Sequence, residues 1–159
     1  MLNLKKILYP TDFSEHSIAA LPYAAGLAQQ NHAALHCMHI VDVPHEEYRT
    51  SEYMVPPEMP HVPKDKLLRT ARVRLDRFIT ESLSGIDTVT SRVVSGEPFE
   101  EIIQYAQDQE IDLIVVGTHG RSAASSMLLG SVAEKVVGKA PCPVLTVRHR
   151  EYTFEMPCV

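Results

Sequence analysis

Apolar residues occur with two different spacings along this chain. Five short segments are almost continuously apolar, which is typical of strands buried on both faces of a parallel sheet. The longer segments between them repeat an apolar residue every three or four positions, the period of a helix with one buried side. The expected strands are Ile7–Tyr9, Ala34–Val41, Thr88–Val94, 112–117 and Pro143–Arg148. The expected helices run from Ser14 to about residue 30, over Lys64–Ser84, from Phe99 to about Asp108 and over Ser131–Gly138.

The alternation of strands and helices predicts an α/β fold. Such an order favours an open parallel sheet with helices on both faces and right-handed crossovers. The only candidate linker is the proline-rich segment 42–63, and a boundary there would leave two β-units without a sheet. We therefore expect one domain over residues 1–159, with a long irregular loop at 42–63 and a tail at 149–159 that carries no clear signal.

Three residues give predictions about where helices begin or bend. Ser14 is a good N-cap for the first helix, whereas Pro22 conflicts with an unbroken helix and predicts a kink or a later start. Ser131 and Glu134 have the spacing of a capping box, which predicts Ser131 as the N-cap of the last helix.

Composition and charge narrow the class of protein. The chain has 159 residues, of which 45% are hydrophobic, and a net charge of −5. This is the profile of an ordinary soluble globular protein, and the negative charge disfavours nucleic acid as a general partner. Three scattered cysteines indicate a reducing compartment, and no segment reads as a signal peptide or membrane span. We expect a cytoplasmic protein with no membrane partner.

Candidate chemistry gathers at the carboxyl ends of the expected strands, where ligands bind in open α/β sheets. The most informative segment is 112–131, in which a buried strand ends at Gly117 and Gly130-Ser131 opens a helix. A strand that leads through glycines to a helix start commonly holds phosphate, because the backbone N–H groups can approach the anion closely. The segment is neither a Walker A loop nor a dinucleotide fingerprint, so an ordinary turn remains the alternative.

Other candidate sites are weaker. His36, Cys37 and His39 suggest metal ligands, but neighbouring side chains on a strand point to opposite faces, so we predict no metal site. His119 and Arg121 could relay a proton or neutralise a phosphate, or simply fill the loop. Because no general base is evident, we predict no catalytic residue.

Several motifs together give a resemblance to a known family. The loop Gly117-x2-Gly120-x9-Gly130-Ser131 resembles the nucleotide loop of the ATP-binding subgroup of the universal stress protein (UspA-like) family. The N-terminal Lys-Lys-Ile-Leu-Tyr-Pro-Thr-Asp-Phe-Ser, the turn at His39-Ile-Val-Asp-Val, the turn Val94-x-Gly96-x-Pro98 and the closing Ala140-Pro-Cys-Pro-Val-Leu-Thr-Val are similar to that family as well. The likeness covers about residues 3–148.

The resemblance implies a Rossmann-like sheet of strand order 3-2-1-4-5 that binds ATP, or ADP or AMP, with or without Mg. It also implies a homodimer that pairs the strand edge at 143–148. The implied nucleotide-binding residues are Pro10, Thr11, Asp12, Val41, Gly117, Thr118, His119, Gly120, Arg121, Gly130, Ser131 and Val132.

Three functions stay open on the sequence. The first is a regulatory, stress-response binding module for adenine nucleotide. The second is a slow ATPase or a nucleotide-dependent transferase that uses the same pocket, and the third is a nucleotide-free interaction protein. The glycine loop favours the first, because it lacks the lysine of a Walker A loop and any evident base.

Overall fold

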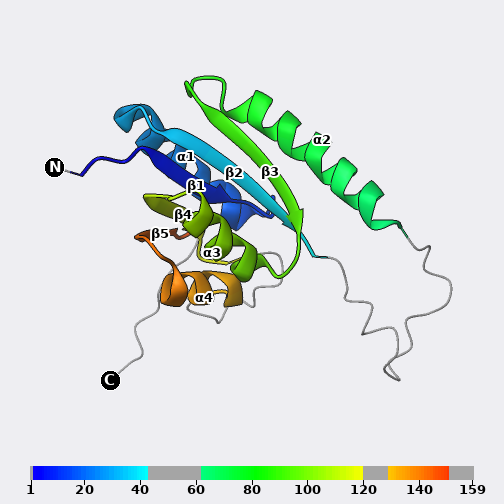
Figure 1. Cartoon of the computed structure of the whole chain (residues 1–159). Coiled ribbons are helices and arrows are strands. Elements are labelled where there is room, and N and C mark those ends of the chain that lie inside the picture. The colour runs from blue at the N-terminus through cyan, green and yellow to red at the C-terminus, as the bar shows by residue number, and fades with distance from the viewer. Residues whose placement is uncertain (1, 43–61, 120–128, 151–159) are drawn as a thin grey trace.

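The computed structural model describes residues 2–42, 62–119 and 129–150 (Figure 1). Its five strands form one sheet in the order β3-β2-β1-β4-β5, and every neighbouring pair is parallel. The strands are β1 (Lys6–Pro10), β2 (Ala34–Val41), β3 (Val89–Ser95), β4 (Leu113–Gly117) and β5 (Val144–Val147). The helices are α1 (Glu15–Asn31), α2 (Lys64–Ser82), α3 (Pro98–Asp108) and α4 (Ser131–Lys139).

This architecture confirms the expected fold class and strand order. The long loop expected at 42–63 and the tail at 149–159 fall mostly outside the described residues, which leave out 43–61 and 151–159. None of the described helices is long and apolar enough to cross a membrane.

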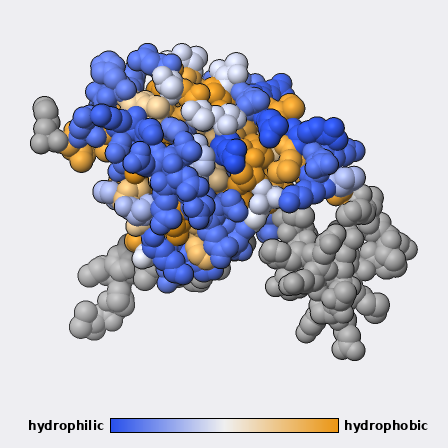
Figure 2. Space-filling view, in the orientation of Figure 1, coloured by the Kyte–Doolittle hydropathy of each residue, from blue (hydrophilic) through white to orange (hydrophobic). Residues whose placement is uncertain are grey.

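Two hydrophobic cores hold the helices on opposite faces of the sheet. Because side chains alternate along a strand, Tyr9 of β1 joins one core and Leu8 joins the other. The first core packs α1 and α2 on the sheet, and the second packs α3 and α4. On the α3–α4 face, hydrophobic surface appears over β2 and β3 beside the hydrophilic outer side of α3 (Figure 2).

Helix α1 packs closely on the sheet through fully buried alanines, Ala20 and Ala24 among them. Its N-cap is Ser14, as predicted, and the Ser14 Oγ accepts a hydrogen bond from the Ser17 N–H at 3.2 Å. The predicted later start is wrong, because α1 begins at Glu15 and continues through Pro22. Pro22 lies on the outer side of the helix, so water can bond the Ile18 carbonyl that the proline leaves without a helical donor.

The start of α4 differs from the capping-box prediction. Gly130, not Ser131, is the N-cap, and no side chain caps this end. Ser131 is the first helical residue, so Glu134 lies one position too far along for the reciprocal bond. The first N–H groups of α4 therefore lack the side-chain acceptor that a capping box would supply.

Strand β2 separates the residues that resemble a metal motif. Cys37 lies in the core beneath α1 and α2, whereas the His36 Nδ1 lies 2.8 Å from the Tyr105 hydroxyl of α3 on the other face. The predicted opposite orientation is confirmed. Within the described ranges, no group of three or more His, Cys, Asp or Glu side chains could hold a metal ion.

Gly117 is required by the close approach of α1 to β4. A Cβ at Gly117 would overlap the His16 carbonyl, whereas a Cβ at Gly26 in α1 meets nothing within 4 Å. We expect Gly117→Ala to lower the free energy of unfolding by about 1–3 kcal/mol through overpacking. The matched change Gly26→Ala should raise it by about 0.5–1 kcal/mol, because alanine is the better helix former. Urea unfolding measures both, and equal effects of the two changes would contradict the close-contact explanation.

His36 should make stability depend on pH. Burial, with a smaller effect of Lys6, lowers the pKa of His36 below 6.5, so the folded protein binds this proton less readily than the unfolded chain. Stability from this group is present above pH 6.5 and is lost as pH falls toward the folded pKa. Urea unfolding at about pH 7.5 and about pH 5.5 should therefore show a smaller acid loss for His36→Gln than for the native chain. The same loss in both would exclude His36 as a contributor.

Candidate functional site

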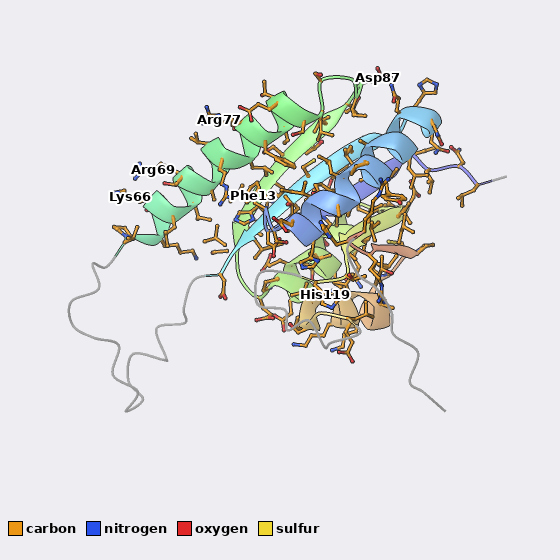
Figure 3. The ribbon with its side chains drawn as sticks, turned by 180° about the vertical axis from the view of Figure 1, so that it is seen from behind. Phe13, Lys66, Arg69, Arg77, Asp87 and His119 are labelled. Carbon is orange, nitrogen blue, oxygen red and sulfur yellow. The ribbon has the colours of Figure 1, made fainter. Side chains whose placement is uncertain are left out.

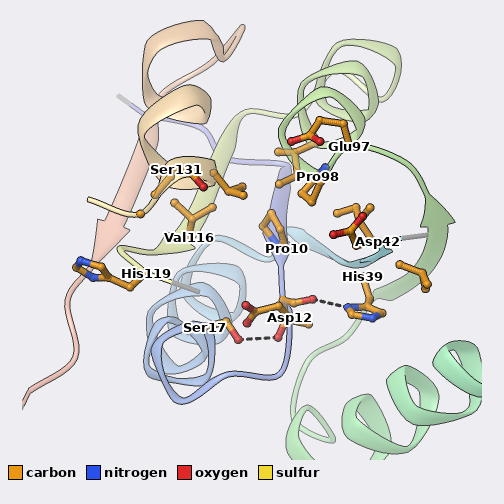
Figure 4. Close-up of a pocket in the computed structure, with 18 residues that line it drawn as sticks. Pro10, Asp12, Ser17, His39, Asp42, Glu97, Pro98, Val116, His119 and Ser131 are labelled. Atoms are coloured by element: carbon orange, nitrogen blue, oxygen red, sulfur yellow. Dashed lines mark hydrogen bonds between the residues drawn. The ribbon is translucent and has the colours of Figure 1, made fainter. Parts of the chain in front are cut away.

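A pocket opens where the strand order reverses, beyond the carboxyl ends of β1 and β4. Its volume is about 710 Å³ (Figure 4). Small-molecule sites commonly have volumes of this order. The walls come from the ends of β1, β2 and β4 and from the starts of α1, α3 and α4. The lining residues are Pro10, Thr11, Asp12, Ser17, His39, Ile40, Val41, Asp42, Glu97, Pro98, Ile102, Val116, Gly117, His119, Gly130, Ser131, Val132 and Ala133.

Most of the residues implied by the resemblance meet in this one cavity. Those that line it are Pro10, Thr11, Asp12, Val41, Gly117, His119, Gly130, Ser131 and Val132. Gly120 and Arg121 lie outside the described residues. Thr118 is described but is not among the lining residues.

Thr118 instead joins the two ends of the glycine loop. It is buried, and its N–H donates to the Val147 carbonyl of β5 at 3.0 Å. Its carbonyl accepts from the Gly130 N–H at 2.6 Å, and its hydroxyl lies 2.9 Å from the His119 Nδ1. Thr118 therefore fixes the start of α4 against β4, which sets one wall of the pocket.

The corner after β1 forms the opposite wall and is closely hydrogen-bonded. The Thr11 N–H donates to the Met38 carbonyl at 2.8 Å, and the Thr11 and Ser17 hydroxyls lie 2.9 Å apart. Asp12 accepts from the Ser14 N–H at 2.9 Å, which makes an Asx turn that leads into α1. These bonds hold the Asp12 carboxylate at the pocket edge.

Tyr9 supports this corner from below. Its hydroxyl donates to the Ser17 carbonyl at 2.8 Å, and burial raises its pKa to about 12. Tyr9 therefore remains a neutral donor at physiological pH and anchors the first turn of α1 to β1.

His39 connects the pocket to α2. Its Nδ1 lies 2.8 Å from the Thr11 carbonyl. Because a carbonyl only accepts, this nitrogen carries the proton. The Phe13 ring packs on His39 with centroids 4.7 Å apart and on Phe78 of α2 at 5.7 Å. The Arg74 guanidinium covers the same Phe13 ring at 4.1 Å. Phe13 is thus the contact between the pocket wall and α2.

The pocket has two electrostatically different sides. The carboxylates of Asp12, Asp42 and Glu97 line the pocket after β1, β2 and β3, whereas Ser131 lines it at the start of α4 (Figure 4). A helix N-terminus carries a partial positive charge and unbonded N–H groups, which favour an anion. The described lining contains no Lys or Arg. The arrangement fits a ligand with hydroxyl or amine donors at one end and an anionic group at the other.

His119 lies at the outer edge of this lining (Figure 4). Its ring centroid is 5.4 Å from that of His16, which is 5.7 Å from His149 beyond β5. The His16 Nδ1 is buried without a hydrogen-bond partner among the described residues. His119 therefore packs toward other imidazoles at the edge of the pocket.

Several lining residues were missing from the predicted set. Asp42 directly follows β2, and Glu97 lies two residues beyond the end of β3, so the rule of strand carboxyl ends could have found both. Whether His39 faces the pocket depends on the register of β2, and whether Ser17 does depends on the turn into α1. The sequence alone gives neither. Ile102 gives no signal in the sequence, because it reads as an ordinary core residue of α3.

The comparisons with known proteins agree with this fold. A model described as the universal stress protein family matches residues 3–148. A universal stress protein of Thermus aquaticus is 37% identical over 145 residues, which cover 91% of this chain and 98% of that protein. The universal stress protein MJ0577 of Methanocaldococcus jannaschii is 31% identical over 155 residues, covering 92% and 96% of the two chains.

Solved structures show the same likeness. That of MJ0577 matches with a TM-score of 0.78 at 33% identity, over 95% of this chain and 100% of the other. Two more distant structures share the fold, each covering 92% of this chain and 98% of the other. One is a universal stress protein in complex with cAMP, with a TM-score of 0.66 at 22% identity. The other, from Archaeoglobus fulgidus, is in complex with dAMP, with a TM-score of 0.61 at 18% identity.

The family model spans almost the whole described sheet, and two relatives above 30% identity cover most of the chain. The chain therefore belongs to the universal stress protein family.

Proposed function

We propose that this pocket binds an adenine nucleotide, with ATP as the favoured ligand, and that the chain acts as a regulatory binding module of the stress response in the cytoplasm. One observation carries the proposal. A single cavity joins the Asp12 carboxylate after β1 to the N-terminus of α4 across the reversal of strand order. The cAMP and dAMP complexes of two proteins with this fold support the nucleotide class.

The two sides of the cavity suit the two ends of a nucleotide. We assign Val41 to the base through its backbone groups and Asp12 to the ribose, because a carboxylate accepts hydrogen bonds from hydroxyl groups. We assign the phosphates to the start of α4 at Gly130, Ser131 and Val132, where the helix has no side-chain cap. The Ser131 and Val132 N–H groups can bind an anion there, whereas the Gly130 N–H already donates to the Thr118 carbonyl.

The negative charge of the pocket sets a condition for binding a triphosphate. Asp12, Asp42 and Glu97 repel a polyphosphate, and the described lining offers no Lys or Arg against it. A triphosphate in this pocket therefore needs compensation by Mg²⁺ bound through its own oxygens or by Arg121, which lies outside the described residues. The glycine spacing at 117, 120 and 130 supports ATP over a nucleotide-free role.

Isothermal titration calorimetry with ATP tests this assignment. Asp12→Asn keeps an oxygen that can accept from the Ser14 N–H but removes the charge toward the ribose. We expect ATP affinity to fall about tenfold, the scale of one charged hydrogen bond, while thermal unfolding is unchanged. The control Glu110→Gln, an exposed change beyond the C-terminus of α3, should bind as the native protein does. Equal affinities of all three proteins would contradict the role of Asp12.

Mass spectrometry of ligand released by heat from freshly purified protein checks the class of nucleotide directly. We expect ATP, ADP or AMP near one per chain. No nucleotide on release and none bound in calorimetry would overturn the proposal. Phosphate release from ATP above about 1 per second would replace the binding module by an enzyme.

We also propose a homodimer that pairs β5 of two copies. In the described sheet β5 is an edge strand, and open edges favour pairing. The Ile114 and Thr118 N–H groups donate to the Pro143 and Val147 carbonyls, both at 3.0 Å. Since backbone groups alternate in direction along a strand, the N–H and C=O of Thr146 point to the open edge.

Thr146→Pro should therefore remove the dimer. The proline deletes an edge donor without removing a bond to β4. Light scattering coupled to gel filtration should give the mass of two chains for the native protein and for the control Thr146→Val, which keeps the N–H. The same assay should give the mass of one chain for Thr146→Pro. A native monomer, or a dimer in all three, would contradict the β5 interface.

A further inference from the structure

Helix α2 carries an unusual concentration of positive charge for this acidic chain. It holds six of the fifteen Lys and Arg residues but only three of the twenty Asp and Glu residues. The six are Lys64, Lys66, Arg69, Arg72, Arg74 and Arg77. The rest of the chain is correspondingly more negative.

The outer side of α2 forms a regular stripe. Ala71 and Leu75 are buried against the sheet, and Lys66, Arg69, Val73 and Arg77 recur every three or four positions on the opposite side. Lys66, Arg69 and Arg77 project away from the body of the protein (Figure 3). Val73 is 70% exposed, and together with Lys66, Arg69 and Thr70 it lines a hollow in the surface. We call Lys66, Arg69, Val73 and Arg77 the cationic stripe.

The stability of the helix does not explain Lys64, Lys66 and Arg69. Lys64 and Lys66 lie in the first turn, where the helix dipole repels positive charge. Lys66 and Arg69 are three apart, so they repel each other as well. The N-cap is Pro63, and no side chain caps this end. Charges that oppose a helix in this way are expected at functional positions rather than at structural ones.

Partners among the described residues do not explain Lys66 and Arg69 either. Among residues 2–42, 62–119 and 129–150, ion pairs join His32 to Asp87 and Arg77 to Glu81. Lys66 and Arg69 belong to neither pair, and both side chains are exposed. The Arg74 guanidinium packs on Phe13. Lys66 and Arg69 are therefore available to an external anion, whereas Arg77, which is also exposed, already bonds Glu81 through its Nε.

We propose that the cationic stripe docks an acidic amphipathic segment of a partner protein. Its carboxylates would pair with Lys66, Arg69 and Arg77, and an apolar residue at its centre would cover Val73. Charge complementarity gives such a contact its specificity and its rate, and the apolar anchor excludes water from it.

The central valine distinguishes this partner from other polyanions. A nucleic-acid backbone gains little from an exposed apolar side chain amid its phosphate contacts, and the net charge of −5 repels a long polyanion. A lipid surface calls for a broader apolar face with aromatic or leucine residues, and this stripe contains one valine.

Fluorescence anisotropy with a labelled helical peptide tests the proposal on the full chain. The probe carries glutamates on both sides of a leucine stripe, and a second peptide replaces every glutamate by glutamine. We expect the glutamate peptide to bind at low ionic strength and to weaken as salt rises, and the glutamine peptide to bind much less. The double change Lys66→Glu with Arg69→Glu should weaken binding at least about tenfold. Val73→Ser should weaken it roughly fivefold.

The matched control reverses two charges on α4 instead, Lys135→Glu with Lys139→Glu, on the other face of the sheet. This control should bind the glutamate peptide within about twofold of the native protein, and circular dichroism confirms that each variant is folded. The proposal is overturned by any of three results. They are no binding of the glutamate peptide, equal weakening by the two double changes, and tighter binding of a DNA duplex or of phosphatidylglycerol vesicles through the same residues.

Discussion

The close contact between β4 and the first turn of α1 determines where everything else lies. Gly117 lies against the His16 carbonyl, and no larger residue fits between the strand and the helix. This contact brings the start of α1 beside the end of β4, and the polar corner around Thr11 follows from it. Without it, the two walls of the pocket would be separated by the width of a side chain. The glycine has a packing role as well as the phosphate role that its motif implies.

The fold could be predicted from the sequence because it depends on the repeating spacing of apolar residues. Continuous apolar strands and helices with one buried side determine a parallel sheet covered on both faces, and the outcome does not depend on exact helix ends. Helix ends were predicted less well, since they depend on single bonds. Pro22 lies on the outer side of α1, where the Ile18 carbonyl is open to solvent. Gly130 takes the cap position that the spacing assigned to Ser131.

Part of the candidate site was predictable from the positions of the strand ends, although Asp42, directly after β2, was missed. Asp12, Val41 and Gly117 all lie at or just beyond a strand end, and the parallel sheet brings their positions to one edge. His39 was missed because its position depends on a hydrogen bond from the end of β2 to the Thr11 carbonyl, just beyond the neighbouring strand β1. Glu97 was missed although it follows β3, because the helix start at Pro98 reads as an ordinary turn. Ile102 also lines the cavity, but the apolar spacing of its helix predicts only that it is buried in the core. Sequence spacing cannot supply such contacts, which arise from the relative placement of elements.

Phe13 has a left-handed backbone, with a φ of 62°. Such a conformation costs a residue with a side chain about 1–2 kcal/mol. This backbone conformation places the ring between His39 and Phe78, beneath the Arg74 guanidinium, and these contacts offset the cost. The Phe13 ring therefore connects the loop after β1 with helix α2 through direct contacts. The pocket residue His39 and helix α2 thus contact one and the same side chain, the phenyl ring of Phe13.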